Sequence, residues 1–339
     1  MRRRILIALL LSAGLVAGGA AWVRDYLDRP LAIADAGYQL DIARGSSWAA
    51  VARQVANDGV TPWAPVLMVF GRLSGQSGRI QAGEYLLPPG TTPRSLLAEL
   101  IAGRVVQHKL TLIEGWSLQE ILREIAAEHA LRRILVATDP AALSRELGLP
   151  QPSAEGAFLP ETYLFTRGTT DRELLLRANA ALNDRLERAW TTRSPHLPLT
   201  RSYELLILAS IVERETALAP ERPRIAGVFI RRLQQGMRLQ TDPTVIYGLG
   251  EHFDGNLTRL DLETDTPWNT YTRDGLPPTP IAAASGAAID AAAKPAEGTE
   301  LFFVASGAGD GSHRFSNTLQ EHEAAVRDYL SALNRRDKD

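Results

Sequence analysis

The sequence predicts an α+β fold made of an N-terminal transmembrane helix, a small α+β domain and a larger mixed α/β domain. Three observations lead to this prediction. A long charge-free run follows a cluster of arginines at the N-terminus. Strand-like and helix-like segments then alternate through the first part of the chain. An almost entirely apolar helix lies in the second half.

The composition is that of a globular protein with nearly balanced charge. Of the 339 residues, 45% are hydrophobic and 22% are charged, which suits two or three domains with buried cores. The formal net charge is −2 and no basic block occurs, so we expect no nucleic-acid partner. The chain has no cysteine, which excludes disulfides, thiolate metal ligands and a cysteine nucleophile. Its histidines show no ligand spacing, and we expect neither a metal nor a cofactor.

The N-terminus predicts a membrane anchor. Three arginines, at residues 2–4, precede a charge-free run over residues 5–23, which approaches the roughly 30 Å of a bilayer core when helical. We therefore expect a cytoplasmic stub at 1–4, a transmembrane helix at 5–23 and a polar tether at 24–37, with the rest of the chain across the membrane. The competing interpretation is a cleaved signal peptide, because small residues fill positions 17–21. The length of the run and Trp22 at an interfacial position favour the uncleaved anchor.

The next segment, residues 38–104, predicts the small domain. Alternating side chains indicate strands, and Ser46, Ser47 and Thr92 are candidate helix caps. We expect, in order, a strand at 38–42, a helix through Val55, a helix from Trp63 towards Leu73, a strand at 81–87 and a helix at 95–102 that stops at Gly103.

Residues 105–150 connect this domain to the larger one. A strand-like stretch at 105–113 is followed by Ser117 and Glu120, which form a capping box for a helix to about Glu128. Further helices are expected at 141–147 and, after a polar and aromatic loop at 155–163, at 171–190.

The most informative segment is the apolar helix that starts near Ser202 and runs into Glu213 and Glu215. Glu213 follows Leu206 and Ala209 on one apolar face of this helix. A carboxyl group kept from water tends to stay protonated, and such a group can donate a proton to a leaving oxygen. The pattern favours acid catalysis by a glutamate. The alternative is a frayed helix end with two solvated acids.

Polar loops follow the apolar helix. Pro223 opens a second helix that stops at Gly236, and residues 239–244 form a compact turn of hydrogen-bonding groups. Another polar loop, 268–271, runs into the proline pair at 277–278. Amides, hydroxyls and aromatic rings on rigid loops suit a carbohydrate ligand. Each motif alone is equally well explained by ordinary turn chemistry.

Three motifs taken in order point to one family. They are ASIVERET at 209–216, RLQTDPTVIYG at 238–248 and NTYTRDGLPP at 269–278. Together they resemble the endolytic murein transglycosylase family, also called MltG or YceG-like. The resemblance extends to EGAFLPETY at 155–163, to the anchor and to a first domain similar to the family's LysM-like module. It implies a LysM-like domain at 38–104, a connecting α/β segment at 105–150 and a transglycosylase domain at 151–335. The chain departs from the family pattern at 279–286, where an Asn-Pro-Gly-like turn is usual.

The resemblance implies a single-pass bacterial inner-membrane enzyme with its folded domains in the periplasm. It would cut nascent peptidoglycan strands between N-acetylmuramic acid (MurNAc) and N-acetylglucosamine (GlcNAc), leaving 1,6-anhydro-MurNAc ends without consuming water. Such cuts would end or trim glycan polymerisation beside cell-wall synthases, the penicillin-binding proteins. No cofactor is implied.

The resemblance also implies roles for single residues. The family's catalytic glutamate, the first acid of its IVExE motif, falls on Glu213, and supporting roles fall on Glu215 and Ser210. Ser210 stands three residues before Glu213 and can reach it with a hydrogen bond. The expected substrate-binding residues are Gln240, Thr241, Asp242, Asn269, Tyr271, Glu161 and Tyr163.

Two other functions stay open at this level. The first is a non-catalytic, membrane-tethered scaffold whose polar loops bind peptidoglycan and in which Glu213 is structural. The second is a muramidase that hydrolyses with water and needs a second carboxylate near Glu213, which Asp242 or Glu161 would supply.

Overall fold

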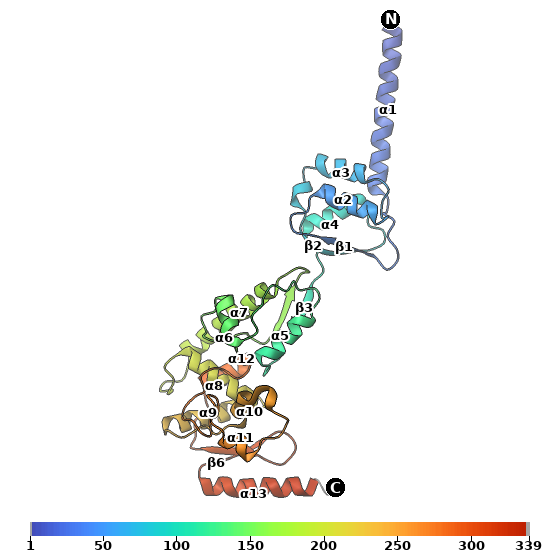
Figure 1. The fold of residues 1–339 in the computed structure, drawn as a ribbon. Helices are drawn as coiled ribbons and strands as arrows, with labels where there is room; N and C mark the ends of the chain where they lie inside the picture. Colours follow the sequence, from blue (N-terminus) through green and yellow to red (C-terminus); the bar gives the residue numbers. More distant parts are fainter. Residues whose placement is uncertain (1, 337–339) are drawn as a thin grey trace. The chain divides into compact units, whose positions relative to one another are not determined.

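The computed structural model describes residues 2–336, which form α-helices and three two-stranded sheets (Figure 1). The chain divides into two compact units. Unit 1 holds the residues up to 108 together with 164–169, and unit 2 holds 109–163 together with the residues from 170 onward. The mixed α+β class with an N-terminal apolar helix agrees with the prediction from the sequence.

Helix α1 (Arg2–Asp28) contains the expected transmembrane segment. Its stretch Ile5–Asp28 is long and apolar enough to cross a membrane, with a mean hydropathy of 2.1. The helix continues to Asp28, so residues 24–28 of the expected tether are helical. The first residue of the expected stub, Met1, lies outside the described residues. Near its end Trp22 packs edge-on against Trp63, with ring centroids 5.4 Å apart.

Unit 1 has the strand–helix–helix–strand order that the sequence predicts. Strands β1 (Tyr38–Ile42) and β2 (Gly83–Leu87) pair antiparallel, with Tyr38 opposite Leu87. The helices are α2 (Trp48–Asn57), α3 (Ala64–Leu73) and α4 (Pro93–Ala102), and a 3₁₀ turn, η1, spans Ser77–Arg79. Ser47 caps α2 and Thr92 caps α4, so local side-chain chemistry sets both helix starts. Gly103 ends α4 in the left-handed conformation, at φ 67°, which glycine adopts without strain.

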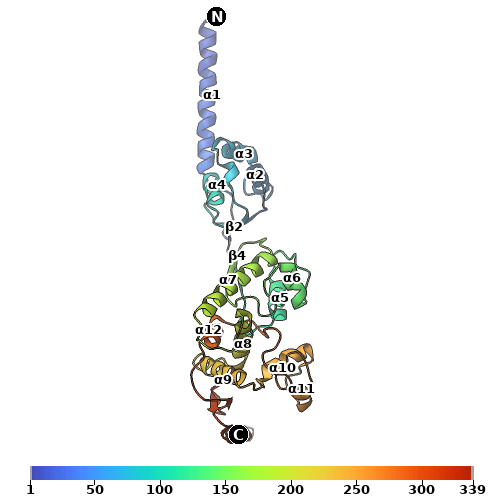
Figure 2. The same ribbon diagram turned by 90° about the vertical axis from the view of Figure 1, so that its left-hand side faces the viewer.

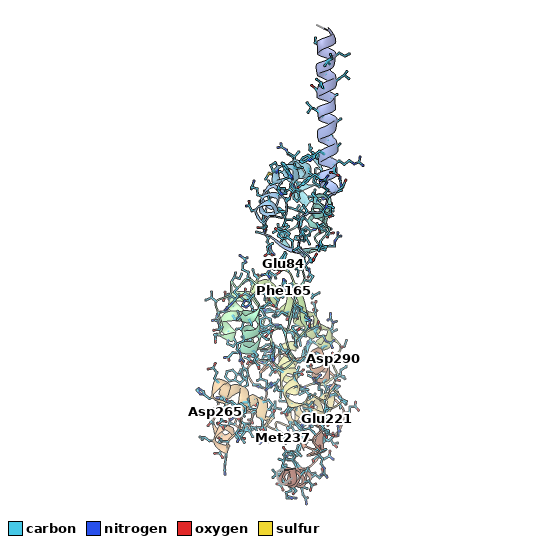
Figure 3. All side chains as sticks on the ribbon, turned by 90° about the vertical axis from the view of Figure 1, so that its right-hand side faces the viewer. Glu84, Phe165, Glu221, Met237, Asp265 and Asp290 are labelled. Carbon is cyan, nitrogen blue, oxygen red and sulfur yellow. The ribbon has the colours of Figure 1, made fainter. Side chains whose placement is uncertain are left out.

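One buried carboxylate stands out in unit 1. Glu84 on β2 accepts hydrogen bonds from Gln39 at 2.6 Å and from Arg167 at 2.9 Å, and His108 lies 2.7 Å away. These partners lower the pKa of Glu84 although burial alone would raise it. Phe165 stacks on His108 at 5.6 Å, so Glu84 and Phe165, both marked in Figure 3, belong to one cluster.

Unit 2 is mainly helical and carries the motifs. Its helices are α5 (Leu118–Ala127), α6 (Pro140–Leu147), α7 (Asp171–Thr191), α8 (Ser202–Glu215), α9 (Arg222–Gln234), α10 (Asp242–Leu249), α11 (Arg259–Glu263), α12 (Gly286–Ala293) and α13 (Leu319–Arg336). A 3₁₀ turn, η2, spans Gly250–His252. Strands β3 (His108–Thr111) and β4 (Thr162–Phe165) pair with each other, as do β5 (Phe302–Ala305) and β6 (His313–Ser316).

Helix α8 is the buried centre of unit 2. All its residues from Leu205 to Val212 are buried, and it packs against α7, α9, α10 and α12 (Figure 2). Each fully buried Leu, Ile or Val contributes roughly 1.5–3 kcal/mol. This burial explains why the acidic residues of α8 lie only outside its buried stretch, with Glu204 in the first turn and Glu213 and Glu215 at the C-terminal end.

Three expectations about elements need correction. The strand expected at 105–113 covers only His108–Thr111. The strand expected from residue 81 begins at Gly83. Part of the turn expected at 239–244 belongs to α10, because Pro243 and Asp242 both favour a first helical turn.

Candidate active site

Glu213 and Glu215 line one cavity of about 700 Å³ at the C-terminal end of α8. Residues two apart on a helix normally face different sides. Here Thr216 leaves the helix in an extended conformation, at φ −147°, so Glu215 is the last helical residue. Both carboxyl groups therefore reach the same space, which Glu161 and Arg222 also line.

Glu213 is held as an ion-paired carboxylate. Arg222 donates from Nη2 to Oε1 at 2.9 Å, and both side chains are almost fully buried, at 10% and 5% exposure. The backbone N–H of Ser285 donates to Oε2 at 2.9 Å, and the Ser285 hydroxyl donates to the same oxygen. Ser285 is the N-cap of α12, so Glu213 also lies at the positive end of that helix. Both oxygens of Glu213 are thus occupied by donors that stabilise a negative charge.

Glu215 has a different environment. Burial raises its pKa from 4.5 to about 7, and the negative charge of Asp242 acts in the same direction. A hydrogen bond from the Thr241 hydroxyl opposes the rise, as do the more distant charges of His313 and Arg232. Glu215 therefore keeps a proton at pH values where an ordinary glutamate has lost it.

The QTDPT and NTY motifs form a polar network around Glu215. The Thr241 backbone N–H donates to the Thr270 hydroxyl at 3.1 Å. The Tyr271 hydroxyl donates to Asp242 at 2.5 Å. Asn269 is fully buried, and its amide donates to three backbone carbonyls of the preceding loop, those of residues 261, 262 and 264. The network fixes Thr241 where its hydroxyl meets Glu215.

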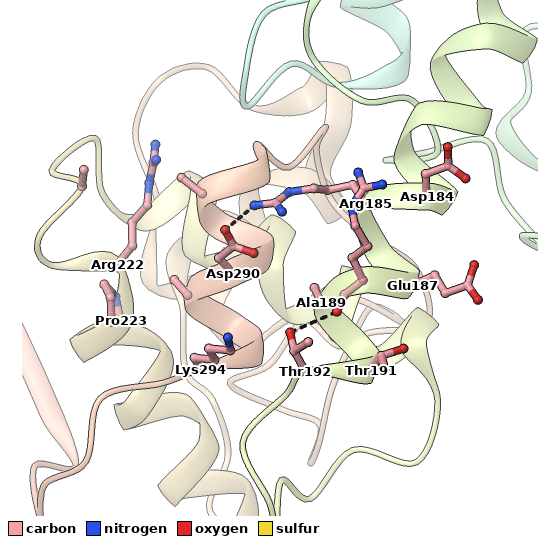
Figure 4. A pocket seen from close by; sticks show the side chains of 14 residues that line it. Asp184, Arg185, Glu187, Ala189, Thr191, Thr192, Arg222, Pro223, Asp290 and Lys294 are labelled. Atoms are coloured by element: carbon pink, nitrogen blue, oxygen red, sulfur yellow. Dashed lines mark hydrogen bonds and ion pairs between the residues drawn. The ribbon is translucent and has the colours of Figure 1, made fainter.

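Arg222 borders a second space. A groove of about 940 Å³ runs between the C-terminal part of α7, the start of α9 and α12 (Figure 4). Arg222 lines this groove as well as the cavity of Glu213 and Glu215, and Arg185 pairs with Asp290 across the groove. The Nε atom of Arg222 is buried without a hydrogen-bond partner within residues 2–336.

Glu155 is a third carboxyl group with an unusual environment. It is 3% exposed and accepts hydrogen bonds from the backbone N–H groups of Leu118 and Gly156 and from the Tyr247 hydroxyl. Burial raises its pKa to about 7 despite these bonds. Glu155 lies in the EGAFLPETY segment and lines a cavity beside the one that Glu213 and Glu215 line.

Comparison with known proteins decides the family. A sequence model of the YceG-like family matches residues 40–328, most of the chain. The chain belongs to the YceG-like family. A relative from Bacillus subtilis (strain 168), named "Endolytic murein transglycosylase", is 30% identical over 312 residues, covering 87% of this chain and 85% of the relative.

Two further YceG-like relatives extend the comparison. A protein of the same name from Streptococcus pneumoniae serotype 2 is 28% identical over 288 residues, covering 75% of this chain and 51% of that protein. The chain thus matches only about half the length of the pneumococcal relative. A crystal structure of a yceG-like protein from Listeria monocytogenes has a TM-score of 0.51 at 28% identity, covering 86% of this chain and 99% of that chain.

The structure brings together some residues predicted from the YceG-like motifs and separates others. Glu161 lines the same cavity as Glu213 and Glu215, and Thr241 contacts Glu215. Tyr163 donates to the Leu159 carbonyl at 2.7 Å, and it is not among the residues that line this cavity. Gln240 is exposed, with φ 48°, and its backbone N–H donates to the Thr270 carbonyl.

The predicted hydrogen bond between Ser210 and Glu213 is wrong. Ser210 is fully buried, and its hydroxyl donates to the Ile207 carbonyl at 2.7 Å. It accepts from the Ile281 backbone N–H at 3.0 Å. The reason is geometric, because a serine inside an apolar helix finds the carbonyl of its own preceding turn first. Ser210 therefore ties α8 to the loop before α12.

Sequence reasoning missed three residues of the site: Arg222, Ser285 and Glu155. Arg222 and Ser285 lie 9 and 72 positions from Glu213, and no local pattern links either to it. Glu155 lies in the EGAFLPETY segment, in which the predicted site residues are Glu161 and Tyr163. Its one signal was a charged residue beside the apolar run 156–160, Gly-Ala-Phe-Leu-Pro.

Proposed function

We propose that this chain is an endolytic murein transglycosylase. It cleaves the MurNAc–GlcNAc bond of peptidoglycan strands internally and without water, which makes it a carbon–oxygen lyase that leaves 1,6-anhydro-MurNAc ends. Three observations support the proposal. The chain belongs to the YceG-like family. Two relatives carry the name of this activity. Two glutamates share one cavity at the end of α8, and one of them keeps its proton near neutral pH.

The proposed reaction rests on one observation, the raised pKa of the Glu215 carboxyl group. A group whose pKa is about 7 can both donate and accept a proton near neutral pH. It first protonates the glycosidic oxygen as the bond to C1 of MurNAc breaks. The resulting carboxylate then accepts the proton of the C6 hydroxyl of the same sugar, whose oxygen attacks C1 and closes the anhydro ring. One carboxyl group is sufficient, whereas hydrolysing glycosidases use two.

The roles of the two glutamates follow from their contacts. The family motif predicts the catalytic role for Glu213. We propose instead that Glu215 transfers the proton and that Glu213 is its ion-paired neighbour. Two features support this exchange. Arg222 and Ser285 occupy both oxygens of Glu213, while Glu215 has one hydroxyl partner and no cation within hydrogen-bonding distance among residues 2–336.

Glu161 is the main residue proposed to contact the glycan strand. Of the substrate-binding residues expected from the sequence, it is the exposed one that lines the cavity. Thr241 positions Glu215, and the charge of Asp242 adds to the burial that raises the pKa of Glu215. Asn269 orders the loop that holds them. Gln240 and Tyr163 are proposed as more distant contacts of the glycan strand.

The proposal extends to location and partners. Helix α1 anchors the chain in the bacterial inner membrane as a single pass, uncleaved, with both units in the periplasm. Residues 38–104 act as a LysM-like module, 105–150 as the connecting segment and 151–335 as the transglycosylase domain. The enzyme works on nascent strands beside the cell-wall synthases, the penicillin-binding proteins, and ends or trims their polymers.

One experiment tests the function and the acid. Purified peptidoglycan is digested with wild type, Glu215→Gln, Glu213→Gln and the control Glu204→Gln on the first turn of α8, and the new ends are identified by mass spectrometry. We expect anhydro ends from wild type and from Glu204→Gln, and none from Glu215→Gln.

Each of the other outcomes would contradict one part of the proposal. Reducing ends would indicate a muramidase, and no cleavage by wild type would favour a binding scaffold. Anhydro ends from Glu215→Gln but not from Glu213→Gln would return the acid role to Glu213.

A further inference from the structure

A cavity of about 510 Å³ adjoins the one lined by Glu213 and Glu215, which we call the catalytic cavity on the basis of the proposed function. It lies between the N-terminal ends of α5 and α6, helix α10 and the loop at Trp268. We call it the aromatic cavity, after Tyr247 and Trp268 in its wall. It shares Gly115 and Arg214 with the catalytic cavity. Its volume falls within the roughly 300–1,000 Å³ of small-molecule sites, enough for one or two sugar rings.

The two aromatic rings are held rigidly. They meet edge to face, with centroids 5.4 Å apart and an interplanar angle of 67°. The Trp268 indole N–H donates to the Thr279 hydroxyl at 2.9 Å, and the Tyr247 hydroxyl donates to buried Glu155 at 3.1 Å. Both polar ends are therefore satisfied inside the protein, while the rings remain half-buried. A fixed aromatic surface costs little conformational entropy when a ligand binds.

The polar residues of this cavity suit a neutral, hydroxyl-rich ligand. Arg123 and Arg214 supply donors, and neither forms an ion pair within residues 2–336. Glu251 and Glu120, which also line the cavity, supply acceptors. Charges of both signs give no preference for an anion or a cation, whereas sugar hydroxyls both donate and accept. The apolar face of a sugar ring packs on an aromatic ring, and its hydroxyls then reach the polar residues at the rim of the cavity.

We infer that the aromatic cavity is a subsite for a sugar ring of the glycan strand, next to the bond that is cut. The inference rests on the proposed function and deepens it. An endolytic enzyme must hold sugars on both sides of the bond, and a cavity that shares Gly115 and Arg214 with the catalytic cavity is placed to hold one of them. Arg214, which donates to the Gly115 carbonyl at 3.2 Å, lies between the two spaces. Binding here aligns the bond with Glu215.

The test compares two tryptophan variants of the full chain in detergent, with uncross-linked glycan strands as substrate. Trp268→Ala removes the ring from the cavity. Trp190→Ala is the matched control, because Trp190 is also half-buried against the same core cluster but is not among the lining residues of the cavity. We expect Trp268→Ala to raise KM about tenfold with kcat within about twofold of wild type, and Trp190→Ala to leave both unchanged. Equal KM values for the two variants overturn the inference.

A second variant tests the subsite if circular dichroism shows that Trp268→Ala does not fold. Gln119→Trp places a bulky ring at an exposed rim position of α5 and removes no buried contact. An increase in KM supports the subsite, and an unchanged KM overturns it. Wild type without anhydro products would refute the proposed function itself, so the two failures are distinguishable.

Discussion

Replacing Glu155 by glutamine is expected to flatten the dependence of stability on pH. Burial raises the pKa of Glu155 from 4.5 to about 7 in the folded protein. Between these values the folded protein holds a proton that the unfolded chain has lost, so the free energy of unfolding falls as pH rises. At about 1.4 kcal/mol for each pH unit, this one carboxyl group costs about 3 kcal/mol by pH 7. Glutamine does not titrate and keeps an oxygen for the N–H groups of Leu118 and Gly156.

The assay is urea denaturation of wild type and Glu155→Gln in detergent at pH 4.5, 5.5, 6.5 and 7.5, read by circular dichroism. The difference between the two proteins at each pH cancels every other titrating group. We expect glutamine to gain about 3 kcal/mol on wild type from the lowest to the highest pH. A difference that stays constant within about 1 kcal/mol would refute the assignment of a buried, protonated Glu155.

Three further predictions follow from the contacts. Cleavage of glycan strands should fall as pH rises through about 7, because Glu215 then loses the proton it donates; an assay of anhydro ends across pH measures this, and a flat rate from pH 5 to 9 contradicts it. Arg222→Gln should lower the free energy of unfolding by about 3–5 kcal/mol in denaturant titrations, since it leaves Glu213 buried without its cation. If Glu213→Gln lowers the free energy of unfolding by the same amount, the unpaired charge of Glu213 is not the cause. Gly71→Ala should cost about 1–3 kcal/mol, because the new Cβ would lie 2.1 Å from the Trp48 ring; an unchanged thermal midpoint would rule out this packing.

Much of the fold is predictable from the sequence because its signals are local. Ser47, Thr92 and Ser117 each cap the helix that follows, and a cap acts within three residues of itself. The boundaries that failed depend on neighbours from elsewhere. A strand lasts only as long as its partner, and β3 ends after Thr111 where β4 begins at Thr162.

The candidate site divides in the same way. The apolar run of α8 and its two terminal acids could be read directly from the chain, as could the motifs that carry the YceG-like resemblance. The environments that underlie our proposal of Glu215 as the acid could not be read from the chain. They depend on Arg222 and Ser285 reaching Glu213, and on Thr241, 26 residues away, reaching Glu215.

The sequence alone determined the class of the protein: an α+β chain with an N-terminal apolar helix, acidic residues at the end of a buried helix and polar loops after it. Periodicity, capping and motif order are properties of neighbouring residues, and they survive without knowledge of the fold. Only the tertiary structure decided which carboxyl group is ion-paired and which keeps its proton. The pKa of a group is set by the charges and the solvent around it, and folding brings those together from distant parts of the chain.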